Sequence, residues 1–402
     1  MSDEASSISL VVIAGVALVS PLIAYRMRRI GVPEVAIELV LGIILGPAVL
    51  GAIHVSSFIS GLAAIGLALL MFLAGFELDL HRVRGRPLRL ASAGWGTSVA
   101  LGLAAASVLF AAGVIRDPLV VGLALTTTAL GTLLPILEDA GVMPTPFGTQ
   151  VLAVGAVGEF GPIVAVAVFL TTKNPLITLL LLAAFVVVAV LAALVAVRAR
   201  TPRTIDFLRS QLDTTSLLPV RLAMFLVILL VYIASQLGLD VLLGSFAAGM
   251  VLRLFAEGSS TKGTMARIDG IAFGFFVPVF FIVSGANLDI RAVIAKPSAM
   301  LLIPAFFALM VLARGLPVLL LYRRVLDTRE RSALALLAAT GLPLIVVIAS
   351  IGVAEGHLLP ANAAALVCAG LLSVLLLPAT GLRILGKQAE KPTALAADGG
   401  SA

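Results

Sequence analysis

The sequence predicts an all-α protein that crosses a membrane many times. Of its 402 residues, 61% are hydrophobic and 12% are charged, and the mean hydropathy is +1.18. A soluble domain carries roughly 25% charged residues. The apolar runs are long enough for membrane-spanning helices, and they lack the short alternating pattern of barrel strands. The single cysteine, Cys368, lies in such a run, which excludes disulfides and thiolate metal sites within one chain.

Thirteen helices are predicted between the breaks that contain charged residues, Gly and Pro. The chain begins with an acidic segment instead of the basic start of a cleaved signal peptide, so the first helix is expected to be retained. The predicted ranges are 8–25, 34–51, 58–78, 90–114, 119–138, 147–171, 176–197, 217–237, 241–256, 270–286, 298–322, 332–353 and 361–385.

Lys and Arg residues gather on one side of this arrangement. With the N-terminus outside, the predicted cytoplasmic loops and tail hold 20 of them, whereas the predicted outer loops hold 4. Cytoplasmic loops of membrane proteins carry such an excess. The basic residues therefore indicate an outer N-terminus, a cytoplasmic C-terminus and an odd number of spans. They do not indicate nucleic-acid binding.

Three short sequence matches suggest an inverted internal repeat. The segment 70–80 resembles 280–290, Thr128–Gly131 resembles Thr340–Pro343, and Leu41–Gly42 resembles Leu243–Gly244, at offsets of 210, 212 and 202 residues. Equivalent helices are seven spans apart, so the two copies would enter the membrane from opposite sides. Inverted repeats are typical of secondary transporters. The predicted organisation is a first repeat plus linker helix over 1–197, a cytoplasmic linker over 198–216, a second repeat over 217–386 and a disordered tail over 387–402.

Two charged residues lie inside apolar runs. Glu159 interrupts the run 151–170 and Arg314 interrupts the run 301–321. A charge at the bilayer centre costs at least ~2.5 kcal/mol, and such residues usually serve ion or proton pathways. Burial disfavours the ionised carboxylate of Glu159 while a nearby arginine would favour it. Glu159 is therefore a candidate for binding a proton or a monovalent cation, with Arg314 as a compensating charge; the alternatives are a structural pair and a snorkelling arginine.

Two predicted helices carry breaks in matching positions. One contains Thr126, Thr127 and Thr128 before a Gly and a Pro, and the other contains Thr340 before Gly341 and Pro343. Interrupted helices in corresponding repeat positions point to a transporter binding site, where freed carbonyls and hydroxyls can replace a cation's hydration shell. Thr127, Thr128 and Thr340 are thus candidate ion ligands. The alternative is kinked packing, with each hydroxyl bonded to its own helix.

Other polar residues give weaker signals. Thr126, Gly158, Ser284 and Asn287 are further candidates for lining the cavity. Solvated positions at helix ends are expected for Glu77, Asp79 and Asp289. No nucleophile triad or phosphate-binding loop is present, so the chain is not expected to be an enzyme, and no cofactor is expected beyond transported ions.

Four segments resemble the monovalent cation:proton antiporter-2 family, which comprises sodium/hydrogen exchangers and Kef-type membrane domains. They are Pro33–Gly51, Ile65–Asp79, Leu243–Gly249 and Pro278–Asp289, and the resemblance extends over residues 8 to 386. It implies a thirteen-helix sodium/proton-antiporter fold, usually dimeric. In this fold, a core domain with two crossing broken helices moves against a dimerisation domain.

The resemblance also implies roles for particular residues. The fifth and twelfth helices should cross near Thr127, Thr128 and Thr340, with the ion-binding carboxylate at Glu159 and the buried basic residue at Arg314. The chain departs from the family at Gly158, where many members carry a second polar residue before the acid. A single carboxylate suggests one-for-one, electroneutral exchange.

The resulting expectation is a multi-pass cell-membrane antiporter, forming a homodimer, that exchanges Na⁺ for H⁺ with Glu159 as the shared site. A K⁺/H⁺ exchanger or K⁺ efflux protein is the first alternative. A Na⁺-coupled symporter of an organic anion is the alternative from another class, and a membrane sensor without transport is a third.

Overall fold

The computed structural model describes residues 2–27, 32–78, 83–169, 175–198, 201, 210, 217–256 and 262–386. Within these ranges the chain is helical and contains no strand, as predicted. Most of the predicted linker 198–216, the predicted tail 387–402 and Asp79 lie outside the described residues.

Every one of the thirteen predicted segments is helical. The helices are α1 (Ser2–Met27), α2 (Glu34–Leu45), α3 (Ser57–Glu77), α5 (Arg86–Ala111), α6 (Pro118–Ala124), α7 (Leu130–Asp139), α8 (Pro146–Phe169), α9 (Pro175–Arg198), α11 (Leu218–Gln236), α12 (Val241–Ala256), α13 (Lys262–Ile271), η2 (Ala272–Phe276), α14 (Val277–Ala286), α15 (Ile290–Ile294), α16 (Pro297–Leu321), η3 (Tyr322–Arg324), α17 (Thr328–Ala338), α18 (Pro343–Ala354) and α19 (Pro360–Leu385). Among the described residues, ten helices are long and apolar enough to cross a membrane. The remaining three predicted segments appear as α2, the α6–α7 pair and α12.

Two of the predicted boundaries are wrong for identifiable reasons. The helix predicted over 34–51 ends at Leu45, because Gly46 precedes a proline and adopts an extended conformation. The helix predicted over 270–286 begins at Lys262 and continues through the π-helical turn η2 into α14. The first turns of this helix are polar, so apolar composition alone did not predict that they are helical.

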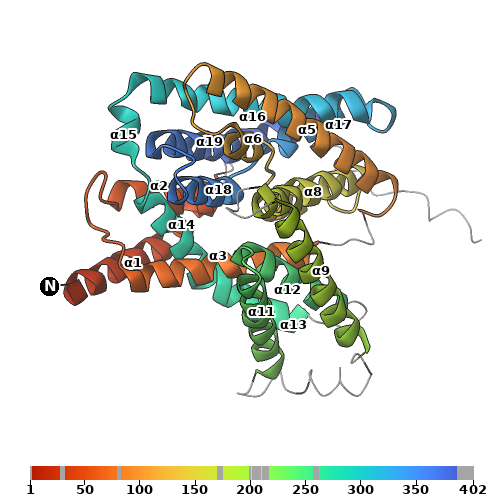
Figure 1. Ribbon diagram of the computed structural model, residues 1–402, viewed down its shortest axis with the longest axis horizontal. Coiled ribbons are helices and arrows are strands. Elements are labelled where there is room, and N and C mark those ends of the chain that lie inside the picture. Colours follow the sequence, from red (N-terminus) through yellow and green to blue (C-terminus); the bar gives the residue numbers. More distant parts are fainter. Residues whose placement is uncertain are drawn as a thin grey trace, which may run out of the picture.

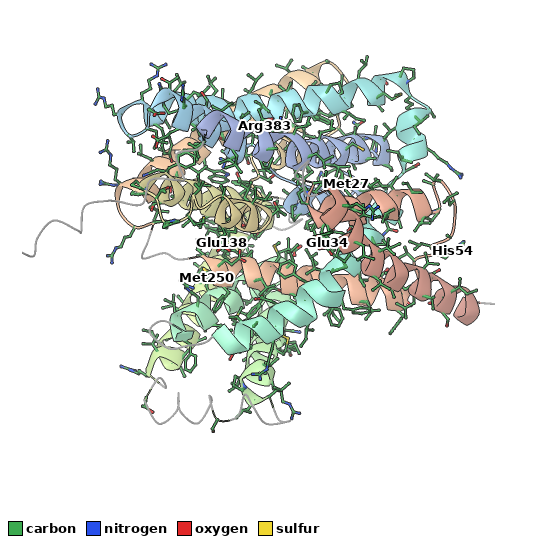
Figure 2. The ribbon with its side chains drawn as sticks, turned by 180° about the vertical axis from the view of Figure 1, so that it is seen from behind. Met27, Glu34, His54, Glu138, Met250 and Arg383 are labelled. Carbon is green, nitrogen blue, oxygen red and sulfur yellow. The ribbon has the colours of Figure 1, made fainter. Side chains whose placement is uncertain are left out.

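The helices form two layers (Figure 1). The crossing layer, in the upper half of the view, contains α5, α6, α7, α8, α16, α17, α18 and α19. The support layer contains α1, α2, α3, α11, α12, α13 and α14. Figure 2 shows the same division from behind, with Arg383 in the crossing layer and Met250 in the support layer. Most helix packing lies within a layer, and α9 contacts both α8 and α12.

Glycines allow the closest approaches within the support layer. A Cβ on Gly75 of α3 would overlap the carbonyl of Phe246 in α12, and one on Gly249 would overlap the carbonyl of Phe72 in α3. A similar mutual contact joins Gly42 in α2 and Gly285 in α14. Small residues at such crossings let helix backbones touch in membranes, where van der Waals packing drives association.

We expect Gly75→Ala to destabilise the protein, because the methyl group can be accommodated only if backbone atoms move. Overpacking of this kind costs about 1–3 kcal/mol, which will lower the thermal unfolding midpoint in detergent. Gly61→Ala is the matched control on the same helix: no atom lies within 4 Å of its Cβ position, so the better helix former should leave the midpoint unchanged or higher. Equal midpoints for the two variants would contradict this account of the α3–α12 contact.

Candidate functional site

Two interrupted helices meet at the centre of the crossing layer. The α6–α7 chain is broken over residues 125–129 and the α17–α18 chain over residues 339–342. The amide of Ala129 donates to the carbonyl oxygen of Thr340 at 2.7 Å. Gly341 has no room for a side chain, since a Cβ would lie 2.7 Å from Oγ1 of Thr127. The two breaks therefore cross in direct contact, as the family resemblance predicted.

The four threonines at the crossing are fully buried. The hydroxyls of Thr126, Thr127 and Thr340 donate to carbonyls of their own helices, namely Leu123 at 2.8 Å, Ala124 at 2.9 Å and Leu336 at 3.2 Å. Only Thr128 reaches across, donating to the carbonyl of Ala338 at 2.6 Å. Local bonding thus satisfies three of these hydroxyls, although each oxygen keeps lone pairs for accepting or coordinating.

Arg314 joins the two breaks to their neighbours. The residue is 2% exposed, so its side chain does not snorkel to an interface. Nε donates to Oγ1 of Thr128 and to the carbonyl of Ala338, both at 3.1 Å, and Nη2 donates to Oγ1 of Thr128 at 2.5 Å. Nη2 also contacts the carbonyl of Val154 in α8 at 3.3 Å, and Nη1 contacts Oγ of Ser98 in α5 at 3.5 Å. A planar fork of five donors suits this set of acceptors.

The absence of a side chain at Gly158 follows from this arginine. A Cβ at Gly158 would overlap Nη2 of Arg314 and Oγ1 of Thr128. The carbonyl oxygen of Gly158 accepts from the amide of Thr128 at 2.9 Å. The space that a second polar side chain would need beside Glu159 is therefore filled by Arg314 and Thr128.

Glu159 points to another part of the crossing. It is 6% exposed, and its carboxylate lies near the backbone of Leu130, the first residue of α7. Amides at a helix N-terminus, together with the helix dipole, favour an anion at this position. In the part of the chain that the structure describes, Glu159 and Arg314 form no ion pair, and charge compensation by Arg314 stays a prediction.

Glu159 lines a small cavity of about 20 Å³. This volume suits one water molecule or one bare ion. The polar residues that line the cavity are Glu159, Glu77 and Thr132, and its other lining residues are Leu70, Leu73, Ala74, Gly131, Phe273 and Pro343. The threonine that lines the cavity with Glu159 is thus Thr132, while Thr127, Thr128 and Thr340 lie in the crossing.

Glu77 is a site residue that the sequence analysis missed. A solvated helix end was expected, but this last residue of α3 lines the Glu159 cavity, with Oε2 lying 3.8 Å from the Cβ position of Gly131. Two further acids, Glu138 and Asp269, are close enough to interact with it electrostatically. Its position in the final turn of an apolar helix could have signalled a charge below the membrane surface. The sequence analysis also missed Ser98 as a site residue. Its position as a polar residue in the middle of an apolar helix could have identified it.

Ser284 and Asn287 line a different cavity. It has a volume of about 260 Å³ and lies between α14 and the α18–α19 pair, with Asp289 and Ser350 as its other polar residues. The two cavities share no lining residue. Ser284 and Asn287 are therefore not brought together with Glu159.

Comparisons with known proteins agree with this architecture. The sodium proton antiporter MjNhaP1 from Methanocaldococcus jannaschii superposes with a TM-score of 0.69 at 19% identity, covering 95% of this chain and 99% of that one. "Putative Na(+)/H(+) antiporter YjbQ" of Bacillus subtilis is 26% identical over 96% of this chain, which spans 64% of the length of YjbQ. "Na(+)/H(+)-K(+) antiporter GerN" of Bacillus cereus is 27% identical over 65% of this chain and 66% of its own length.

The family model described as "Sodium/hydrogen exchanger, transmembrane" matches residues 14–386, which is nearly the whole described chain. The match includes both broken helices, Glu159 and Arg314. This multi-pass membrane protein therefore belongs to the sodium/hydrogen exchanger family.

Proposed function

We propose that this protein exchanges a monovalent cation for protons across the membrane, with Glu159 as the site that both ions share. The observation that carries the proposal is the cavity that Glu159 and Glu77 both line, with room for a single small occupant. Two carboxylates that share one small cavity cannot both ionise without compensation. A proton on one carboxylate or a cation between the two relieves the repulsion, so the two ions compete.

The ligands in this cavity suit a hard cation. Glu159, Glu77 and Thr132 are its polar lining residues, and among its lining residues there is no Lys or Arg. Alkali cations bind through such carboxylate and hydroxyl oxygens. An organic anion would meet two acids and too little space, so the Na⁺-coupled symporter alternative is disfavoured. We propose Na⁺ as the cation, with K⁺ as the alternative that the printed name of GerN favours.

The positions of the two acids suggest how exchange proceeds. Glu159 belongs to the crossing layer and Glu77 to the support layer. A movement of one layer against the other would carry Glu159 from the Glu77 cavity toward the cavity at Ser284 and Asn287. Because only Glu159 would travel, we propose electroneutral exchange of one cation for one proton. We further propose a homodimer in the cell membrane, with the N-terminus outside and the C-terminus in the cytoplasm.

Glu159→Gln should abolish cation-dependent proton flux, because the amide cannot exchange a proton or balance a cation's charge. Glu159→Asp should keep measurable flux at a reduced rate. The measurement is dye-detected proton flux in proteoliposomes on addition of Na⁺, K⁺ or Li⁺. Flux retained by the Gln variant would place the shared site elsewhere, and no wild-type flux with any cation would remove the antiport proposal.

Glu77→Gln should keep exchange but raise the cation concentration needed for half-maximal flux by about tenfold, since one coordinating charge is lost at ~1.4 kcal/mol per factor of ten. Glu355→Gln is the matched control, because Glu355 is an exposed acid at the end of α18. An unchanged half-maximal concentration for Glu77→Gln would exclude Glu77 from cation binding.

Arg314→Lys distinguishes a positioning role from charge compensation alone. Lysine keeps the charge but lacks the fork that contacts Thr128, Ala338 and Val154. Hydrogen bonds to charged groups contribute about 1.5–3 kcal/mol, so the variant should show both a lower unfolding midpoint and reduced flux. Wild-type stability and flux in the lysine variant would show that only the charge matters.

A further inference from the structure

An apolar groove lies beside the candidate ion site, outside the cavities described above. It has a volume of about 440 Å³ and its walls come from α8, α9 and α12. Every lining residue is apolar except Arg253. The volume falls within the range of about 300–1,000 Å³ typical of ligand pockets, but the lining offers almost no hydrogen-bonding partner. A polar metabolite would therefore lose its hydration without replacement, whereas a hydrocarbon chain would not.

The groove has a positive charge at one end. Arg253 lies in the last turn of α12, and its guanidinium carbon is 5.7 Å from the centroid of the Phe76 ring. Arg198 lies in the last turn of α9, the helix packed against α12. In the orientation predicted from the distribution of Lys and Arg, α9 and α12 end on the same side. The proposed orientation makes this the cytoplasmic side.

We propose that this groove binds an anionic glycerophospholipid, with one acyl chain along the apolar walls and the phosphate at Arg253. Guanidinium groups bind phosphate oxygens through paired charge-assisted hydrogen bonds. Basic pockets between membrane helices on the cytoplasmic side bind lipid head groups in this way. The inference depends on the membrane placement of the chain and not on the antiport proposal. A neutral lipid would contact the apolar walls equally well, but it would carry no net negative charge to pair with Arg253 at the end of the groove.

The position of the groove gives the lipid contacts with both layers. Phe160, the residue after Glu159, stacks on Phe246 of α12 with ring centroids 5.1 Å apart, and both rings line the groove. Met250, another lining residue, belongs to α12 in the support layer (Figure 2). A lipid seated here touches α8 in the crossing layer, α12 in the support layer and α9 between them.

The test is native mass spectrometry of the detergent-purified full chain, mixed with equal amounts of phosphatidylglycerol and phosphatidylcholine. We expect the wild type to retain phosphatidylglycerol preferentially. Removing one arginine near a membrane surface costs about 1 kcal/mol, so Arg253→Gln should weaken this retention about fivefold and abolish the preference. Arg253→Lys should keep the preference, because the positive charge remains.

A filled groove provides the second arm of the test. Ala189 lines the groove, whereas Ala184 is an exposed residue of the same helix that does not. Ala189→Phe should reduce retention of both lipids, and Ala184→Phe should leave both unchanged. Equal retention of the two lipids by the wild type would overturn the proposal. Undiminished lipid retention in both Arg253→Gln and Ala189→Phe would also overturn it. A third contradicting result is a shift from dimer to monomer in Ala189→Phe with lipid binding intact, because it would assign the groove to a second copy of the chain.

Discussion

The hydrogen bonds of Arg314 are the interaction on which the site depends. A helix break inside a membrane leaves amides and carbonyls without partners, and each unsatisfied group costs several kcal/mol there. The crossing satisfies them mutually, since Ala129 bonds to Thr340 and Thr128 bonds to Gly158. Arg314 completes the arrangement by donating to Thr128, Ala338 and Val154 at once. Neither break is satisfied without the other, so the two broken helices form one unit.

Glu159 and its neighbour Gly158 lie against different parts of this unit. Gly158, which has no side chain, packs against Arg314. The carboxylate of Glu159 lies near the first turn of α7 and lines a small cavity. The arginine therefore stabilises the framework, and the α7 amide stabilises the carboxylate. This separation leaves Glu159 without a bound counter-ion among the described residues. A carboxylate in that condition needs a proton or a cation, which is the basis of the proposed shared site.

The division into two layers places the two acids of the candidate site on different parts of the structure. Glu159 and Glu77 come from different layers, and two cavities with polar lining residues contain residues of both layers. Glycine contacts such as Gly75 with Phe246 bind the support layer tightly to itself. Contact between the layers is less extensive than packing within them, which agrees with the proposed movement of one layer against the other. The groove along α8, α9 and α12 lies where such movement would change the shape of a bound lipid's surroundings.

The sequence by itself determined the membrane class, the thirteen helical segments and the two breaks. Long apolar runs must become helices in a bilayer, and Gly and Pro among threonines interrupt them. It also identified Glu159 and Arg314 as candidate site residues, since charged residues inside a membrane span are energetically costly and are usually functional. Only the tertiary structure decided their partners. Arg314 bonds to Thr128 instead of Glu159, Thr132 and Glu77 line the cavity, and Ser284 and Asn287 line another. These outcomes depend on side-chain direction and on contacts between residues far apart in the chain, which helical periodicity and residue type do not encode.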